Sequence, residues 1–334
     1  MKLKSGNCAS MCVLFALGAV GLHGPAAAAE GWQPQNPVEI VVPNAAGGEN
    51  DRVSRFIQRI LEQKKLVPTP VLVVNKAGGS QVLSAAYVAK YTGNPHYLLY
   101  ATGTLLSNHI AGLTPLNYLD FTPIAKLRCD NSALTVATDS PIKSMRDLLD
   151  RLKANIKSVS FGTVSRAGAN NLVISKALRS AGIDPKGLKV VIFKSNAMSM
   201  TSVMGKHVDA VASSVSAAYQ NFEAGTLRIL AVSSPKRLTG ILANVPTMAE
   251  SGLDVAGVSN CRYVFAPKGI TAEQRAYWEN AMAAVNDDAE WKQDIAKRNQ
   301  TEEFLRGKEL ESALDHTYKS TKETMIDIGL AKSE

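Results

Sequence analysis

The sequence is poor in the features on which nucleic-acid-binding and membrane-spanning proteins depend. Aromatic residues make up only 6% of the chain, and the 37 Lys and Arg residues are scattered along it. A nucleic-acid surface usually shows a basic cluster, so no nucleic-acid partner is expected. The net charge of +8 indicates solubility and a mild attraction for anions. After residue 29, no stretch approaches the roughly 18 uncharged apolar residues of a membrane span.

The sequence also lacks the motifs of common enzymes. It contains neither G-x-G-x-x-G nor G-x-x-x-x-G-K-[ST], so nucleotide binding lacks its usual motifs. The histidines do not have metal-ligand spacing, so no metal and no cofactor are expected. Ser165 lies in a turn, but the spacing around it is not G-x-S-x-G. Paired carboxylates such as Asp287-Asp288 fall in charged helical segments. These absences predict that the protein is not an enzyme.

The first 29 residues have the pattern of a secretory signal peptide. Lys2 and Lys4 precede an apolar core at 11–22, and Ala27-Ala28-Ala29 provides small residues for cleavage. We therefore expect an exported protein that is cleaved near Ala29.

Cysteine is scarce. Two of the four cysteines lie inside the expected signal peptide, which leaves Cys129 and Cys261 in the mature chain. In an oxidising compartment this pair could form a disulfide, and two separate thiols are the alternative.

Strands and helices alternate along the mature chain. Apolar strands at 38–42, 71–74 and 97–101 are separated by helical patterns at 51–66 and 82–90. This βαβαβ order predicts a mostly parallel sheet with helices on both faces. The alternation of strands and helices restarts in the middle of the chain. After residue 101, a polar connection is expected at 221–226. The further strands and helices are expected at 124–127, 134–137, 144–153, 159–161, 170–181, 190–193, 200–204, 208–212, 229–232, 263–266, 271–286 and 309–328.

The middle segment reads as an insertion between two chain ends that share a domain. We expect one lobe from residues 30–128 and 262–334, a second lobe from 129–261, and two crossovers that join them. Open α/β sheets bind ligands at the carboxyl ends of their strands. A ligand cleft between the lobes is therefore predicted.

Small-residue turns connect several predicted strands to the helices that follow. A helix start offers unpaired N–H groups and the positive end of the helix dipole to an anion, and small residues allow close approach of the backbone. Each turn alone is more often a plain helix cap. Their repetition in both lobes favours an anion site, in the turns Asn44–Asp51, Lys76–Ser80, Thr102–Ser107, Thr163–Asn170 and Lys194–Thr201.

Several runs of sequence carry a resemblance to a known family. The most specific are Leu227-Arg-Ile-Leu-Ala-Val232, Val245-Pro-Thr-Met-Ala-Glu-Ser-Gly252 and Phe265-Ala-Pro267, and Pro37-Val-Glu-Ile-Val-Val-Pro43 followed by Gly47-Gly48 agrees with them. From Pro37 to the C-terminus the chain resembles the solute-binding receptors of tripartite tricarboxylate transporters. These are periplasmic proteins.

The resemblance implies an α/β, two-lobed periplasmic-binding-protein fold of type II-like form, with two doubly wound domains joined by two crossover strands. Such a receptor, a monomer, closes like a Venus flytrap on a small organic carboxylate and delivers it to membrane subunits. Loops of both lobes hold the carboxylate in this family. Together with the strand-exit turns, the resemblance predicts as ligand-binding residues Asn44, Ala45, Ala46, Gly47, Gly48, Gly79, Ser80, Thr104, Thr163, Ser165, Arg166, Ala167, Gly168, Ser195 and Asn196.

The departures from the family pattern fall in these loops. Ala45-Ala46 stands where the family usually has Pro-Pro, and Ser165 and Ala167 replace glycines. The identity of the ligand therefore cannot be carried over. Arg166 could pair with a second carboxylate of the ligand, or it could face solvent at the rim of the cleft.

Cys261 stands where a Trp is typical of the family, and both mature cysteines fall near the predicted crossovers. Crossover segments run side by side in this architecture, so a disulfide between Cys129 and Cys261 is feasible.

Two other functions remain open at this point. The protein could be a ligand sensor's periplasmic partner, or a hydrolase that uses Ser165 with His109 or His207. For the binding function, Gly47→Val is expected to impair binding because bulk there would block the approach of the main chain.

Overall fold

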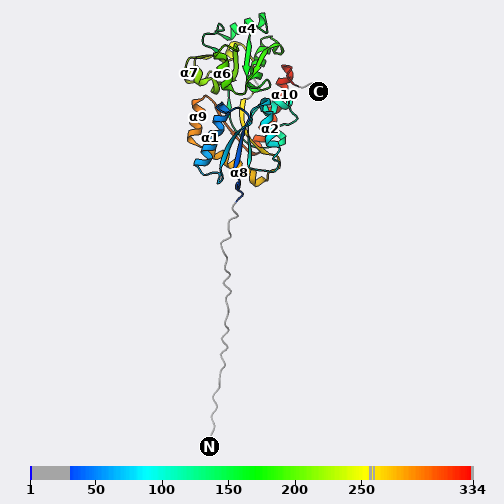
Figure 1. The fold of residues 1–334 in the computed structure, drawn as a ribbon, viewed down its shortest axis with the longest axis vertical. Coiled ribbons are helices and arrows are strands. Elements are labelled where there is room, and N and C mark those ends of the chain that lie inside the picture. Colours follow the sequence, from blue (N-terminus) through cyan, green and yellow to red (C-terminus); the bar gives the residue numbers. More distant parts are fainter. Residues whose placement is uncertain (2–30, 256–257, 259, 332–334) are drawn as a thin grey trace. The chain divides into compact units, whose positions relative to one another are not determined.

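The computed structural model describes residues 1, 31–255, 258 and 260–331. The chain divides into two units, Met1–Gly31 and Trp32–Glu334, and all helices and strands of the described residues belong to the second (Figure 1). Apart from Met1, the expected signal peptide lies outside the described residues, so it stays a prediction.

One sheet has six strands in the order β11-β4-β10-β3-β1-β2. β1 pairs in parallel with β2 and β3, whereas β10 is antiparallel to β3 and β4, and β11 is antiparallel to β4. The strands are β1 (Val38–Val42), β2 (Val71–Asn75), β3 (Tyr97–Thr102), β4 (Phe121–Asp130), β10 (Asn260–Pro267) and β11 (Thr301–Leu305).

The other sheet has five strands in the order β7-β6-β8-β5-β9. β6 is parallel to β7 and β8, and β5 is antiparallel to β8 and β9. The strands are β5 (Ser132–Ala137), β6 (Ser160–Thr163), β7 (Lys189–Ile192), β8 (Ala210–Ser214) and β9 (Leu227–Val232).

Both sheets are therefore mixed, and the expectation of a mostly parallel sheet was wrong. The βαβ units pair in parallel as predicted, but β4, β5, β9, β10 and β11 pair antiparallel with their neighbours. The alternation of strands and helices fixes direction only within a βαβ unit. It says nothing about a strand that returns from the other sheet.

The helices cover the sheets and mostly follow the predicted segments. Helix α7 begins before the polar connection expected at 221–226 and overlaps it, and α9 was not predicted. No helix among the described residues is long and apolar enough to cross a membrane. The α-helices are α1 (Glu49–Gln63), α2 (Val82–Ala89), α3 (Thr104–Ile110), α4 (Met145–Ala154), α5 (Ala169–Ser180), α6 (Asn196–Met204), α7 (Val215–Glu223), α8 (Ala272–Asn286), α9 (Ala289–Lys297) and α10 (Gly307–Asp327).

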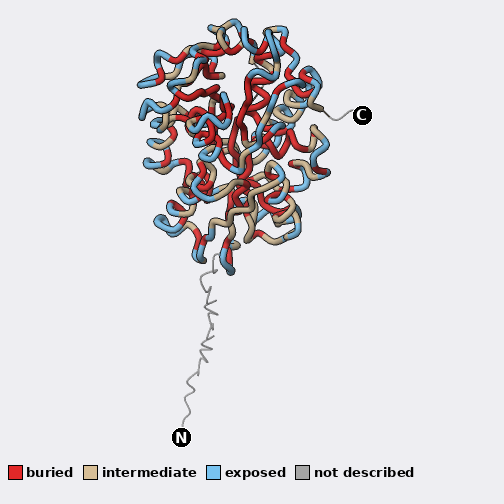
Figure 2. Tube along the Cα trace, turned by 45° about the horizontal axis from the view of Figure 1, so that its top comes forward, coloured by how far each residue is buried: buried red, intermediate tan, exposed pale blue. Residues whose placement is uncertain are grey.

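The first strand and helix show how the sequence builds these layers. Val38, Val41 and Val42 of β1 are fully buried because the strand has neighbours in the sheet and helices on its faces. In α1 the apolar residues recur at helical spacing, so one face is buried and the opposite face is polar. Figure 2 shows the same division, with buried segments in the interior and exposed segments at the periphery.

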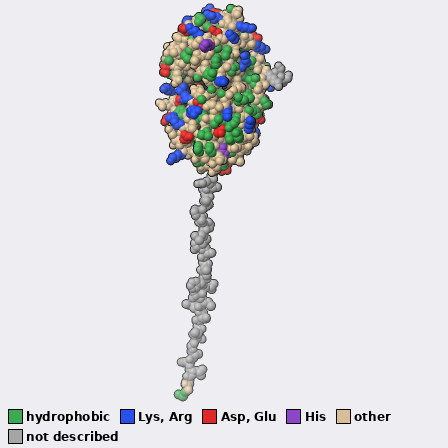
Figure 3. Space-filling view, viewed as in Figure 1, with side chains coloured by type: hydrophobic (Ala, Val, Ile, Leu, Met, Phe, Trp, Pro, Cys, Tyr) green, Lys and Arg blue, Asp and Glu red, His purple; other side chains and the backbone are tan. Residues whose placement is uncertain are grey.

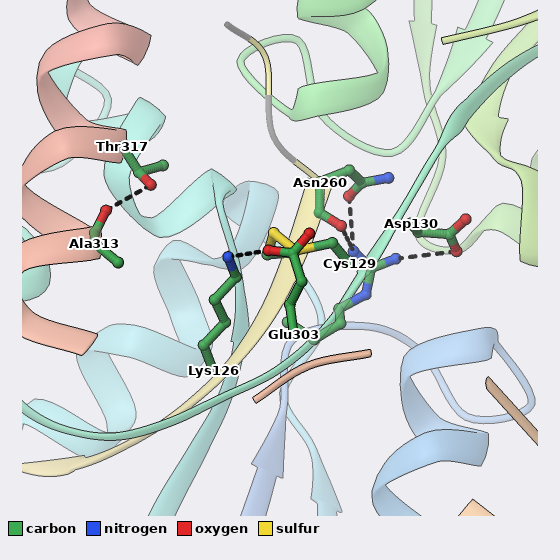
Figure 4. The surroundings of a disulfide bond; sticks show 9 residues. Lys126, Cys129, Asp130, Asn260, Glu303, Ala313 and Thr317 are labelled. Carbon is green, nitrogen blue, oxygen red and sulfur yellow. Dashed lines mark hydrogen bonds and ion pairs between the residues drawn. A yellow bond between two sulfur atoms is a disulfide. The ribbon is translucent and has the colours of Figure 1, made fainter. Parts of the chain in front are cut away.

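The two sheets are connected through β4 and β10. β4 ends at Asp130 and β5 starts at Ser132, so the chain passes from one sheet to the other with a single residue between them. β10 lies beside β4, with Cys261 opposite Cys129 in the register. A disulfide joins these cysteines (Figure 4). The adjacent β4 and β10 thus carry a covalent link near the point where the chain leaves the six-stranded sheet.

Figure 3 shows one face of the molecule, on which Lys and Arg are interspersed with acidic and apolar side chains. The visible face has no continuous basic patch.

Candidate ligand-binding site

A cavity of about 260 Å³ lies where strands of both sheets end. Pro43 and Asn44 follow β1, Thr102 ends β3, Thr163 ends β6 and Ile192 ends β7, and all of them line the cavity. The carboxyl ends of parallel strands are the usual ligand-binding edge of α/β sheets.

The structure brings many of the predicted ligand-binding residues together around this cavity. They come from turns that precede helices or 3-10 helices and from the end of β6. The predicted residues in the lining are Asn44, Gly79, Ser80, Thr104, Thr163, Ser165, Gly168 and Asn196.

The other predicted residues do not line the cavity. Gly47 and Gly48 line a separate hollow next to the start of α6, and Arg166 is exposed. The predicted residues outside the main lining are Ala45, Ala46, Gly47, Gly48, Arg166, Ala167 and Ser195.

The backbone of Gly47 gives a second reason to expect an effect of Gly47→Val. A Cβ atom at Gly47 would meet nothing within 4 Å, but the residue has a φ of 79°. A branched residue is strained in this region of backbone space. The substitution would therefore strain the backbone, and the expected block of ligand approach stays a prediction.

The turn after β2 has an uncommon backbone. Gly78, Gly79, Ser80 and Gln81 have φ values of 139°, 55°, 50° and 82°, and all four line the cavity. Two consecutive non-glycine residues with positive φ indicate stored strain, which tends to occur at ligand sites. The Asn108 Nδ2 atom donates to the carbonyl of Ser80 at 2.6 Å and helps to hold the turn.

The side chain of Gln81 also fixes this turn against β3. Its amide nitrogen donates to the hydroxyl of Thr102, and its carbonyl oxygen accepts from the Thr102 backbone N–H at 3.2 Å. Gln81 was not predicted as a site residue, and Thr102 was predicted only as part of the turn Thr102–Ser107. Their pairing depends on contact between residues that are far apart in the sequence.

The turn between β6 and α5 supplies hydrogen-bonding groups that are free to meet a ligand. Thr163 and Ser165 are buried, and their hydroxyls have no hydrogen-bond partner among the described residues. Gly168 precedes α5, and a Cβ atom there would approach the Thr104 hydroxyl to 3.2 Å. The first residues of α5 line the cavity too, so its N-terminal N–H groups add a positive dipole.

The charged residues of the cavity lining are both cations. Lys194 is exposed, whereas Arg262 on β10 is only 3% exposed. The described lining contains no Asp or Glu. An anion would meet a favourable potential in this cavity, because nearby unlike charges attract strongly in a low-dielectric site.

Arg262 is a site residue that the sequence analysis missed. Its Nη1 atom donates to the Asn260 carbonyl at 3.0 Å and to the Asn260 Oδ1 atom at 2.7 Å. Burial lowers the pKa of Arg262, but the Glu49 and Asp130 carboxylates, together with Tyr100, outweigh burial and raise it. An arginine within the apolar run of β10 was a possible signal, since a buried charge requires partners.

A network of ion pairs extends from this site toward α1 and α9. Arg128, which is 0% exposed, pairs with Asp294 at 3.0 Å and with Glu49 at 3.5 Å. Burial would raise the pKa of Asp294, but hydrogen bonds and charge from Arg52 lower it to about 2. Burial raises the pKa of Asp130, which lies at the end of β4.

Two residues of the cavity lining that follow strands of different sheets, Asn44 and Lys194, are in contact. The backbone N–H of Ala45 and the side-chain amide of Asn44 both donate to the carbonyl of Lys194, each at 3.4 Å. Ile110, Leu172 and Met325 belong to a small apolar cluster that joins α3, α5 and α10.

Two mixed α/β sheets with a polar cavity at their strand ends are the fold of known periplasmic binding proteins. The structure of the periplasmic binding protein BugD superposes with a TM-score of 0.80 at 23% identity and covers 90% of this chain and 100% of its own. The chain belongs to the tripartite tricarboxylate transporter receptor family, whose model matches residues 53–308.

Other proteins agree with this assignment. A protein of Cupriavidus necator, described as the UPF0065 protein in the gbd 5' region, is 27% identical to this chain over 326 residues. The match spans 96% of this chain and 97% of that protein. A structure from R. palustris with adipate has a TM-score of 0.79 at 22% identity and covers 89% of this chain and 99% of its own. MatC from Rhodopseudomonas palustris with bound malate has a TM-score of 0.74 at 21% identity and covers 90% and 100%. The family and these neighbours are binding proteins rather than enzymes.

Proposed function

We propose that this protein captures a small organic carboxylate in the periplasm and delivers it to the membrane subunits of a tripartite tricarboxylate transporter. The observation that carries the proposal is the chemistry of the cavity. Its lining contains the cations Arg262 and Lys194 and the hydroxyls of Thr163 and Ser165, which have no hydrogen-bond partner in the described part of the chain. None of the described residues in the lining is an Asp or Glu. The family assignment and the structures with adipate and malate support a carboxylate.

Binding would replace the hydration of the carboxylate with fixed donors. Thr163 and Ser165 each offer a buried O–H that lacks a protein partner. A ligand oxygen that accepts these bonds removes the cost of leaving the donors buried and unpaired. The start of α5 adds further N–H groups and the positive end of a helix dipole.

Closure of two lobes would make these contacts simultaneous. We propose lobes of residues 30–128 with 262–334 and of 129–261, hinged where β4 and β10 run side by side. Opening would break the bonds from Asn44 and Ala45 to Lys194. A ligand shifts such an equilibrium only by its differential affinity for the closed state, so the contacts from both sides of the cavity favour closure.

The pattern of the first 29 residues supports export with cleavage near Ala29. The proposed receptor acts as a monomer. A sensor's periplasmic partner would use the same cavity, so only its protein partner would differ.

A hydrolase would need a base beside Ser165. Neither His109 nor His207 lines the cavity. His109 instead shares a hydrogen bond of 2.8 Å with the hydroxyl of Tyr318. The described geometry therefore favours binding without catalysis.

A thermal-shift screen of the mature protein tests the proposed function. The panel pairs each carboxylate with its neutral amide and includes sugars and divalent cations as controls. A carboxylate at 100 times its dissociation constant should stabilise the fold by about 2.7 kcal/mol. Stabilisation by sugars or cations, with no effect of any carboxylate, would contradict the proposal.

A further inference from the structure

Arg262 is a buried cation of the cavity lining, and its one ion pair among the described residues is long. Its Nη1 atom donates to Asn260, which is neutral. The Asp130 Oδ2 atom pairs with Nη2 at 4.0 Å, beyond hydrogen-bond distance, and the Nε atom has no partner among the described residues. A buried charge whose donors are not all satisfied is costly.

The carboxylates nearby are engaged by other groups. Glu49 pairs with Arg128 and Arg52, and Asp294 pairs with Arg52, Arg128 and Arg298.

Asp130 accepts from the hydroxyl of Ser216 and from the Gln300 amide, and burial raises its pKa. Tyr100 is neutral because burial raises its pKa to about 12. The arginines of this described network therefore outnumber its carboxylates by one, since it contains Arg52, Arg128, Arg262 and Arg298 against Glu49, Asp130 and Asp294.

Neutral donors form a second group in the lining. The unpartnered hydroxyls of Thr163 and Ser165 lie at the turn before α5, where Thr104 of α3 comes close to Gly168. Arg262 comes from β10, where it is opposite Thr102 in the register. The cavity thus offers neutral donors at the β6–α5 turn and a buried guanidinium on β10.

We propose that Arg262 is the specificity-determining residue for a dicarboxylate, whose first carboxylate binds the donors of the β6–α5 turn and whose second binds the guanidinium of Arg262. The second carboxylate supplies the negative charge that the buried network lacks. A guanidinium has a planar set of donors that matches a carboxylate and can form two parallel bonds. This inference rests on the proposed function, and it names the ligand class and the residue that recognises it.

Titration calorimetry of the mature wild-type protein with linear dicarboxylates from succinate to adipate, and with their monoamides, tests the inference on the ligand side. Each monoamide keeps one carboxylate and replaces the other with a neutral group of similar size. We expect the best dicarboxylate to bind about 30-fold or more tightly than its monoamide, as for the loss of one partner of a buried charge pair. This comparison needs no substitution, so it is independent of folding defects.

The protein side uses Arg262→Gln, Arg262→Lys and the control Arg179→Gln, which changes an exposed arginine in the last turn of α5. We expect Arg262→Gln to reduce dicarboxylate binding by about 30-fold or more and to leave monoamide binding nearly unchanged. Arg262→Lys should recover part of the lost binding, and Arg179→Gln should bind like the wild type. Thermal unfolding of each variant without ligand checks that it is folded.

The outcomes separate the two proposals. Equal wild-type affinity for dicarboxylates and monoamides, or equal losses of both ligands in Arg262→Gln, overturns the role of Arg262 but leaves carboxylate capture intact. Binding of neither a dicarboxylate nor a monoamide, together with no response to any acid in the thermal-shift panel, overturns the proposed function itself.

Discussion

At the residue scale, Asp294 is the main acceptor of the ion-pair network behind the cavity. It accepts hydrogen bonds from Arg52, Arg128 and Arg298 at 3.0 to 3.1 Å. Arg128 is fully buried and stacks over the ring of Trp291 at 4.6 Å. Removal of one partner of such a buried pair leaves an uncompensated charge and typically costs about 3–5 kcal/mol. Asp294 therefore stabilises the sheet edge that carries the site.

This role predicts a dependence of stability on pH. The pKa of Asp294 is lowered from 3.8 to about 2 in the folded protein. A carboxylate whose pKa is lower in the folded protein than in the unfolded protein stabilises the fold at pH values above its unfolded pKa. This stabilisation is lost as the pH falls through its folded pKa. The contribution of Asp294, about 2 kcal/mol at neutral pH, should therefore disappear mostly between pH 5 and pH 2.

Urea unfolding of the wild type and of Asp294→Asn across this range measures the effect. The difference in unfolding free energy between the two proteins isolates the contribution of Asp294 from those of other acids. Asp130 is one of these, and its raised pKa changes stability with pH in the opposite direction. A difference in unfolding free energy that stays constant from pH 5 to pH 2 would show that Asp294 does not carry this charge interaction.

At the scale of elements, the disulfide between β4 and β10 fixes two strands that carry site residues. Cys261 is adjacent in sequence to Arg262, and Cys129 is adjacent to Asp130. Lys126 and Glu303 form an ion pair near the disulfide (Figure 4). The covalent link closes a loop with a sequence separation of 132 residues. A cross-link over so long a loop restricts the unfolded chain strongly.

Reduction of this disulfide should lower the unfolding free energy by about 2–5 kcal/mol. The oxidised wild type, the reduced wild type and the double variant Cys129→Ala with Cys261→Ala are compared by urea unfolding. The reduced protein and the variant should both be less stable than the oxidised protein. Equal stability of the oxidised and reduced wild type would contradict a stabilising link.

Elements with regular hydrophobic patterns could be predicted from the sequence. β1 matches the expected 38–42 because four of its five residues are apolar and β-branched, and α1 follows its helical spacing. β11 could not be found this way because its sequence, TEEFL, is charged and mostly exposed.

The site was predictable only where it consists of local turns. Thr163, Ser165 and Gly168 belong to one turn with a recognisable small-residue pattern. Arg262 joins the site because β10 returns beside β3 and β4, and that pairing connects residues far apart in the chain. No local pattern specifies it.

At the scale of the whole molecule, residues from both sheets line the cavity that we propose as the binding site. The six-stranded sheet contributes the turn after β2 and Arg262, and the five-stranded sheet contributes the β6–α5 turn and Lys194. Neither sheet alone provides both the neutral donors with unpartnered hydroxyls and the buried cation. The account therefore requires the ligand to contact both sides at once.

A crystal structure of the mature protein grown with its tightest carboxylate tests this requirement most directly. The account predicts ligand density within the cavity, with carboxylate oxygens in hydrogen-bonding distance of Thr163 or Ser165 and of Arg262. Density elsewhere, for example in the surface hollow lined by Arg52, Arg55 and Lys297, with the cavity between the sheets unoccupied, would contradict it.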